Sequence, residues 1–199
     1  MSAGHASGAS GRVGMWLFIA TETLLFGGLF LLYSTYRLKN PADFHAGSLE
    51  LSRLFGTINT CFLITSSFTV ALGVLSLHEN RPKRARLFLL ATIGFAFAFL
   101  VVKAFEWSAK FEHGLFPNAA FLMARPRGEI LYFGLYYLMT GLHAVHVIAG
   151  IGVLSFVFLW VKRGHVTAGH PVLFENAGLY WHLVDIIWIF LFPLFYLIT

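Results

Sequence analysis

Five long apolar runs dominate the pattern of hydrophobic and polar positions along the chain, and short polar segments separate them. Each run has at least the roughly 20 residues that a helix needs to cross a membrane. The pattern therefore predicts an all-α fold, an integral membrane bundle of five transmembrane helices. The predicted spans are Val13–Tyr33, Phe55–Leu77, Leu87–Ser108, Ile130–Val161 and Ala177–Ile198.

Several runs have features that predict how they pack. The second run is rich in Ser and Thr, which let helices approach closely and hydrogen-bond across the contact. Gly150 and Gly152, in the fourth run, are expected at close helix contacts. That run has no Asp, Glu, Lys or Arg and exceeds the length of a span, so we expect it to tilt or to begin outside the hydrocarbon. Pro193 is expected to kink the fifth helix near its end.

The residues before the first span differ in composition from the rest. Met1 to Gly11 is rich in Gly, Ser and Ala and shows no apolar periodicity. We therefore expect residues 1–12 to form a disordered amino-terminal tail. Residues 13–199 are expected to form the five-helix transmembrane domain.

Composition and charge exclude several classes of protein. The chain is 58% hydrophobic and only 12% charged, which leaves a soluble domain of this size too little polar surface. The formal net charge is +5, but the basic residues lie in short loops between apolar runs, as expected beside anionic lipid headgroups. We therefore expect membrane lipids, and no nucleic acid, as partners.

Loop charge also predicts the orientation of the chain. The amino-terminal side carries seven Lys and Arg residues, the opposite side six, and four of the seven cluster around the shortest loop. Because cytoplasmic loops are enriched in Lys and Arg, we expect the amino terminus inside and the carboxyl terminus outside. The seven are Arg12, Arg81, Lys83, Arg84, Arg86, Lys162 and Arg163; the six are Arg37, Lys39, Arg53, Lys110, Arg125 and Arg127.

A few titratable residues interrupt the apolar runs. An Asp at membrane depth costs about 3 kcal/mol on insertion scales, so such groups turn inward toward partners. His143 and His146 share a helix face, as do His182 and Asp185, and we expect the second pair to bond to each other. Glu22 has two interpretations: a carboxyl group that handles protons or holds a lipid headgroup, or a protonated partner in an interhelical hydrogen bond.

Glu106 stands three residues after Lys103, near the end of the third run. A local ion pair, with the lysine reaching toward the membrane surface, explains both residues. Together with His143, His146, His182 and Asp185, Glu106 is expected to belong to a structural polar seam inside the bundle.

No catalytic or metal-ligating set is complete in the sequence. His-x-x-His occurs once and Glu-x-x-His does not occur, so zinc and di-iron ligand sets lack members. The single cysteine, Cys61, lies in an apolar run, and no Gly-x-Ser-x-Gly or Gly-rich phosphate loop is present. We therefore assign no catalytic, metal-binding or cofactor-binding residue, and do not expect catalysis by the chain alone.

Five motifs carry a resemblance to a known family. They are GMWLFIATETLLFGGLF around Glu22, LFGTINTCFLITSS, KAFEWSAKFEHG around Glu106, TGLHAVHVIAG and FENAGLYWHLVDIIWIFLF. From Arg12 to Leu197 the chain resembles subunit III of the haem-copper oxidases, the cytochrome c oxidase and quinol oxidase family, in its short five-helix form. The longest members have seven helices, and this chain lacks the first two.

The resemblance implies an accessory subunit in a complex. Subunit III binds no redox centre; haem and copper lie in partner subunits, and the partners are the catalytic subunit I and subunit II. Bound phospholipid is also implied. Glu22 matches the family's intramembrane glutamate, and His165 falls near a position that contacts lipid headgroups. The expected location is the bacterial cytoplasmic (inner) membrane.

These observations lead to one functional hypothesis and two alternatives. We expect a non-redox subunit III of a proton-pumping terminal oxidase, which supports subunit I in stability, lipid binding and proton uptake during aerobic respiration. The first alternative is a haem-binding membrane anchor that uses His143, His146 and His182. The second is subunit III of a quinol oxidase in place of a cytochrome c oxidase.

Overall fold

The structure is a computed structural model that describes the backbone of residues 3–198 and the side chains of residues 11–198. These residues form seven helices and no strand. Five helices are long and apolar enough to cross a membrane, which confirms the predicted all-α bundle. The long helices are α1 (Ala3–Lys39), α3 (Arg53–His78), α4 (Pro82–Glu112), α6 (Arg127–Lys162) and α7 (Val172–Tyr196); the short ones are α2 (Pro41–Leu49) and α5 (Ala120–Met123).

The amino-terminal segment is helical where it is described. α1 begins at Ala3, so the helix runs through the segment that we expected to be a disordered tail. Extending a helix by one residue costs far less than starting one, and no proline interrupts residues 3–12. The polar composition of this segment therefore did not mark the start of the helix.

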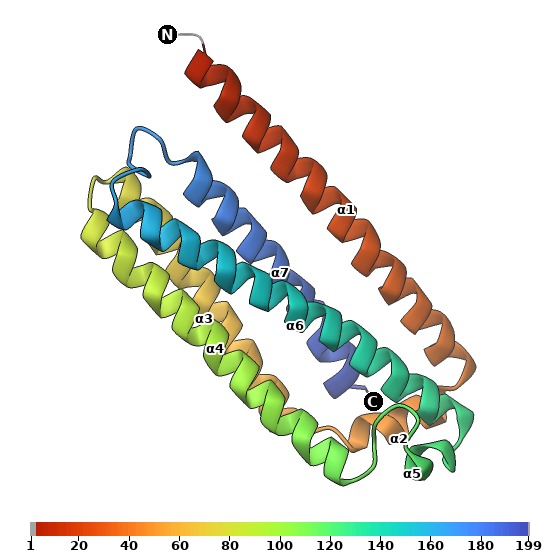
Figure 1. Ribbon diagram of the computed structural model, residues 1–199. Coiled ribbons are helices and arrows are strands. Elements are labelled where there is room, and N and C mark those ends of the chain that lie inside the picture. The colour runs from red at the N-terminus through yellow and green to blue at the C-terminus, as the bar shows by residue number, and fades with distance from the viewer. Residues whose placement is uncertain (1–2, 199) are drawn as a thin grey trace.

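The five long helices form a bundle with α1 at its margin (Figure 1). α3 and α4 lie side by side as an antiparallel pair, joined by a turn in which Asn80 has φ +59°. α7 packs against both α3 and α6, and α6 also contacts α4. α1 contacts α6 and α7, and only 6% of its most apolar stretch is buried.

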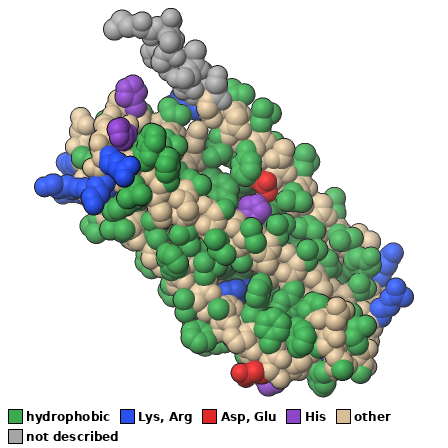
Figure 2. All heavy atoms as spheres, in the orientation of Figure 1, with side chains coloured by type: hydrophobic (Ala, Val, Ile, Leu, Met, Phe, Trp, Pro, Cys, Tyr) green, Lys and Arg blue, Asp and Glu red, His purple; other side chains and the backbone are tan. Residues whose placement is uncertain are grey.

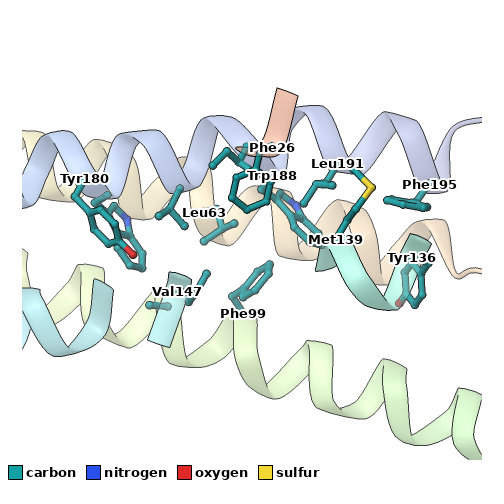
Figure 3. Close-up of a cluster of buried hydrophobic side chains, with 14 of the residues drawn as sticks. Phe26, Leu63, Phe99, Tyr136, Met139, Val147, Tyr180, Trp188, Leu191 and Phe195 are labelled. Carbon is teal, nitrogen blue, oxygen red and sulfur yellow. The ribbon is translucent and has the colours of Figure 1, made fainter. Parts of the chain in front are cut away.

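The core lies where α3, α4, α6 and α7 meet (Figure 3). The indole of Trp188 packs edge-on against Phe99, with ring centroids 4.8 Å apart. Leu63 from α3 and Met139 from α6 are also buried there, and Phe26 of α1 is 1% exposed. The largest fully buried side chains among the described residues are thus all aromatic.

Hydroxyl groups of α3 bond to neighbouring helices, as predicted. Trp181 donates its indole N–H to the Ser66 hydroxyl at 2.9 Å, and Trp188 donates to Thr60 at 3.0 Å. Thr69 bonds to Thr92 of α4 at 2.8 Å. Where lipid gives no hydrophobic drive toward association, these bonds help to fix the helix contacts.

The two glycines of α6 differ in their surroundings. A Cβ atom added at Gly150 would lie 2.6 Å from the ring of Trp181, which confirms the predicted close contact. A Cβ atom at Gly152 would meet nothing within 4 Å, so the same prediction is wrong there. Gly150 faces α7, whereas Gly152 is exposed on the outside of the bundle.

The short helices cover the first turns of α6, which are therefore packed against protein. Asp43 of α2 accepts a hydrogen bond from the Gly128 amide at 3.1 Å. Arg125 bonds to Glu129 at 2.8 Å and to Glu50 at 3.2 Å. The hydrogen bond to Glu129 raises the pKa of the Arg125 guanidinium above its usual value.

α6 is 36 residues long, or about 54 Å, well beyond the roughly 30 Å of hydrocarbon.

The carboxyl end of α7 continues past Pro193 to Tyr196. The last carbonyl groups of a helix have no partner within it. Here the hydroxyl of Tyr33 donates to the Leu194 carbonyl, and Tyr132 donates to the Phe195 carbonyl at 2.6 Å. Tyrosines of α1 and α6 therefore cap the end of α7.

Candidate functional site

Glu22 of α1 and His146 of α6 form a polar contact inside the membrane bundle. Glu22 Oε2 lies 3.0 Å from His146 Nε2, and the two side chains are 15% and 14% exposed. His146 Nδ1 lies 2.8 Å from the Leu142 carbonyl oxygen. Because a carbonyl oxygen only accepts, Nδ1 carries a proton. The contact at Nε2 therefore holds one further proton, which can reside on either the imidazole or the carboxyl group.

The residues on either side of Glu22 do not reach another helix. Thr21 donates its hydroxyl to the Phe18 carbonyl at 2.7 Å, and Thr23 donates to the Ile19 carbonyl at 2.8 Å. Both threonines are satisfied within α1 and remain exposed. Within the Thr-Glu-Thr sequence, Glu22 is thus the residue whose side chain bonds to α6.

The surroundings of His146 hold its ring in place. Phe26 packs edge-on against the imidazole, with ring centroids 5.4 Å apart. Tyr180 of α7 donates its hydroxyl to the His146 carbonyl oxygen at 2.9 Å. Residues from α1, α6 and α7 therefore meet at the Glu22–His146 contact. In Figure 2, acidic and histidine side chains interrupt a largely hydrophobic face near its middle.

A second polar cluster joins α4, α6 and α7. Lys103 Nζ lies 3.2 Å from Glu106 Oε2 and donates to Tyr136 at 2.9 Å and to Tyr196 at 2.7 Å. The hydroxyl groups of Tyr136 and Tyr196 in turn donate to the Glu106 carboxylate at 2.8 and 2.7 Å. Every member of this cluster therefore has partners.

The predicted ion pair between Lys103 and Glu106 is confirmed, but the position of Lys103 is not as expected. The two side chains are 3% and 1% exposed, so the lysine is buried in the bundle and does not reach for the membrane surface. Two tyrosine hydroxyls replace water around the ammonium group, and the Tyr136 ring lies 4.6 Å from Nζ. Tyr136 stands seven residues before His143 and so lies on the same face of α6, which is the one signal in the sequence that could have placed it in this cluster.

His143 lies apart from His146, although both belong to α6. It is completely buried between Phe99 and Trp188, with ring centroids at 5.5 and 5.2 Å. Neither of its ring nitrogens has a hydrogen-bond partner among the described residues. The helix places His146 toward α1 and His143 toward α4 and α7, so the two histidines do not act as one group.

The expected bond between His182 and Asp185 is wrong. His182 Nδ1 bonds to the Ser67 hydroxyl of α3 at 2.6 Å. Both carboxyl oxygens of Asp185 lack a partner among the described side chains, although the residue is only 3% exposed. The rotation of α7 places His182 beside α3, where a hydroxyl is within reach.

His165, the expected lipid contact, lies in the loop between α6 and α7. Its side chain is exposed, and its ring packs on Trp160 with centroids 5.4 Å apart. The basic residues near this loop gather at one end of the molecule (Figure 2). Within the part of the chain that the structure describes, no three His, Cys, Asp or Glu side chains form a group that could hold a metal ion.

The fold and these contacts define the chain as a multi-pass membrane subunit whose buried titratable groups bond to other side chains across the bundle. It belongs to the cytochrome c oxidase subunit III family, whose profile matches residues 5–199. Members of this family are accessory, non-redox subunits of haem-copper oxidases. A haem-binding membrane anchor is not favoured.

Individual relatives agree with this membership. The chain is 33% identical to a cytochrome c oxidase subunit 3 from Synechocystis sp., over 93% of this chain and 74% of that protein. It is 32% identical to the same subunit from Thermostichus vulcanus, over 94% and 87%. It is also 32% identical to a heme-copper oxidase subunit I+III from Aeropyrum pernix, over 94% of this chain and 22% of that longer protein.

Proposed function

We propose that this chain binds the catalytic subunit I of a proton-pumping terminal oxidase, beside subunit II, and supports it in stability, lipid binding and proton uptake during aerobic respiration. Membership of the subunit III family supports this proposal. The relative from Aeropyrum pernix, named as subunit I+III, supports a partnership of one copy with subunit I. The names of the other relatives favour cytochrome c over a quinol as the electron donor.

The Glu22–His146 contact carries the proposal of a role in proton uptake. The 3.0 Å contact joins a carboxyl group and an imidazole, two groups that are each able to accept or donate a proton. Histidine is the side chain whose unperturbed pKa lies nearest to neutrality, which suits it to exchange protons. The contact keeps 14–15% of each side chain exposed, so a partner or a proton donor can reach it.

Lipid binding is proposed for the surface of α1. A Cβ atom added at Gly14, Gly27 or Gly28 would meet nothing within 4 Å, and Leu24 and Leu31 are 76% and 72% exposed. A helix so little covered by its own chain needs apolar neighbours in the membrane, and phospholipid acyl chains provide them. We place headgroups near His165 and the basic loops, on the cytoplasmic side of the bacterial inner membrane.

The test of this function compares Glu22→Gln with Glu22→Ala in the purified oxidase. The amide of the glutamine can still donate to His146 Nε2, whereas alanine removes the contact and its bond, worth about 1–3 kcal/mol. We expect both variants to assemble with normal haem spectra. Both should release fewer protons per electron, or lose activity after fewer turnovers, than the unmodified complex.

The measurement is proton release per electron in reconstituted vesicles, with activity followed until it stops. Thr21→Ala is the matched control, because its hydroxyl bonds only within α1 and its loss should change neither quantity. A Glu22→Gln complex that equals the unmodified one throughout, beside a loosely assembled Glu22→Ala complex, would show that Glu22 serves packing alone.

A further inference from the structure

A pocket lies at the end of the bundle where the turn between α3 and α4 meets the loop between α6 and α7 (Figure 1). Its volume is about 260 Å³, and we call it the loop pocket. Two of the residues that line it, Leu77 and Val161, are apolar and only 1% and 4% exposed. Its polar groups come from Asn80, Arg86, Lys162 and Thr167.

The charges that line the loop pocket are all positive. Arg86 belongs to the second turn of α4 and is partly buried, while Lys162 ends α6 and is exposed. Among the described residues, no carboxylate lines the pocket beside them. Two cations from different helices thus share one small pocket, where like charges repel each other. An anion bound in the pocket offsets that repulsion.

Arg86 differs from other basic residues at this end of the bundle. Arg12 bonds to Glu175 at 2.9 Å, and Arg81 bonds to Glu79 at 3.0 Å, so each has an acidic partner within the chain. Arg86 is partly buried and pairs with no carboxylate among the described residues. Its guanidinium has five N–H donors and has lost part of its water. A ligand with several acceptor oxygens supplies what the chain does not.

The donors of the loop pocket suit a phosphate group. A guanidinium binds two phosphate oxygens at once, and an ammonium group adds a compact point charge. The amide of Asn80 and the hydroxyl of Thr167 are further donors. Pockets for drug-sized ligands begin at about 300 Å³, so this one fits a small polar group.

We infer that the loop pocket is a binding site for a phosphate group, held between Arg86 of α4 and Lys162 of α6. Because α4 begins and α6 ends here, both an anionic phospholipid headgroup and a dissolved phosphate can reach the pocket. His165 does not line it, so the site is separate from the lipid contacts proposed for α1 and His165. The inference goes beyond the proposed function and requires no partner subunit.

The first experiment measures phosphate binding by the full-length chain, purified in a nonionic detergent and freed of lipid. The melting temperature is followed as sodium phosphate replaces sodium chloride at constant ionic strength. A ligand that binds the folded chain raises this temperature until the site is full. Losing a charge-assisted hydrogen bond weakens binding at least about tenfold, which we expect for both Arg86→Gln and Lys162→Gln. Arg86→Lys keeps the charge without the paired donors and should bind with intermediate affinity.

The second experiment tests the lipid source. The chain is reconstituted into vesicles of equal parts phosphatidylglycerol and phosphatidylcholine, extracted again, and its retained lipid is counted by native mass spectrometry. We expect one phosphatidylglycerol per unmodified chain and at least tenfold less on Arg86→Gln/Lys162→Gln. The matched control for both experiments is Lys83→Gln/Arg84→Gln, which removes the same charge from exposed positions of α4 outside the loop pocket and should behave as the unmodified chain.

The two experiments together separate the sources and decide the inference. Phosphatidylglycerol retention that only the pocket variant loses identifies a lipid headgroup, and stabilisation by sodium phosphate that only the pocket variant loses identifies a dissolved phosphate. Equal losses in the pocket variant and the control would reveal only a general attraction of anions to this end and would overturn the inference. Unchanged binding in the pocket variant, or no binding to the unmodified chain, would also overturn it and would leave the proposed function as it stands.

Discussion

Lys103 and Asp185 are both titratable side chains buried within transmembrane helices, yet their surroundings differ. Lys103 has a carboxylate and two tyrosine hydroxyls as partners, so its cluster is complete within the chain. Asp185 has no partner among the described residues. A buried polar cluster in which every group is bonded stabilises and rigidifies the bundle, whereas a buried polar group without a partner is costly.

The Lys103–Glu106 pair yields a prediction about stability. Replacing Lys103 alone by methionine leaves the Glu106 carboxylate buried without its cation, which should cost about 3–5 kcal/mol of unfolding free energy. Thermal unfolding of the detergent-solubilised chain measures the change.

The double variant Lys103→Met/Glu106→Gln tests the reason for that loss. It removes both charges and keeps the tyrosine hydroxyls bonded to an amide, so it should recover most of the lost stability. A double variant as unstable as Lys103→Met would contradict the view that the unpaired charge is the cause.

At the scale of single residues, the sequence indicated which polar residues matter but not which side chains they bond to. Glu22, Glu106 and the histidines stand out because polar groups are rare in apolar runs. The partner of Glu22 is 124 positions away, at His146, and that pairing depends on how α1 and α6 are rotated. Spacing along one helix cannot supply such a rotation, which is why the expected bond between His182 and Asp185 was wrong.

At the scale of helices, the predicted spans and the observed helices agree because composition alone sets which segments cross a membrane. The ends agree less well, since α1 begins ten residues before its predicted span, at Ala3 in place of Val13. Gly150 and Gly152 show the same limit within a helix. They are two residues apart in one apolar run, but only Gly150 faces Trp181.

This difference yields a matched pair of substitutions. Gly150→Ala places a methyl group 2.6 Å from the buried ring of Trp181, and it should cost about 1–3 kcal/mol as overpacking. Gly152→Ala meets open space and should be neutral or stabilising by up to about 1 kcal/mol.

Thermal unfolding of both variants in the same detergent checks the prediction. Equal melting temperatures for the two variants would mean that α6 and α7 can move apart enough to admit the methyl group without a loss of stability. The close contact at Gly150 would then not contribute to holding the two helices together.

At the scale of the molecule, the number of spans and the family followed from the sequence, while the arrangement of the helices did not. Five apolar runs and five motifs were enough for the first two. The position of α1 at the margin, and the cover that α2 and α5 give to α6, arise from contacts between distant segments such as Asp43 and Gly128. No periodicity within a run encodes them.

The orientation in the membrane remains a prediction that can be measured. With Cys61 replaced by serine, Thr167→Cys probes the loop between α6 and α7, and His113→Cys probes the opposite end. In right-side-out bacterial vesicles, an impermeant maleimide should label the His113 position and not the Thr167 position. Labelling of Thr167 alone would reverse the assigned orientation.

An odd number of spans also restricts how this chain can be joined to another. The start of α1 and the end of α7 lie at opposite ends of the bundle (Figure 1). A polypeptide that carries subunit I ahead of this chain, without an additional span in the linker, must bring the carboxyl end of subunit I to the side where α1 begins. Fusion in that order therefore keeps the orientation of this chain only if subunit I ends on that side, while the reverse order requires subunit I to start on the other side.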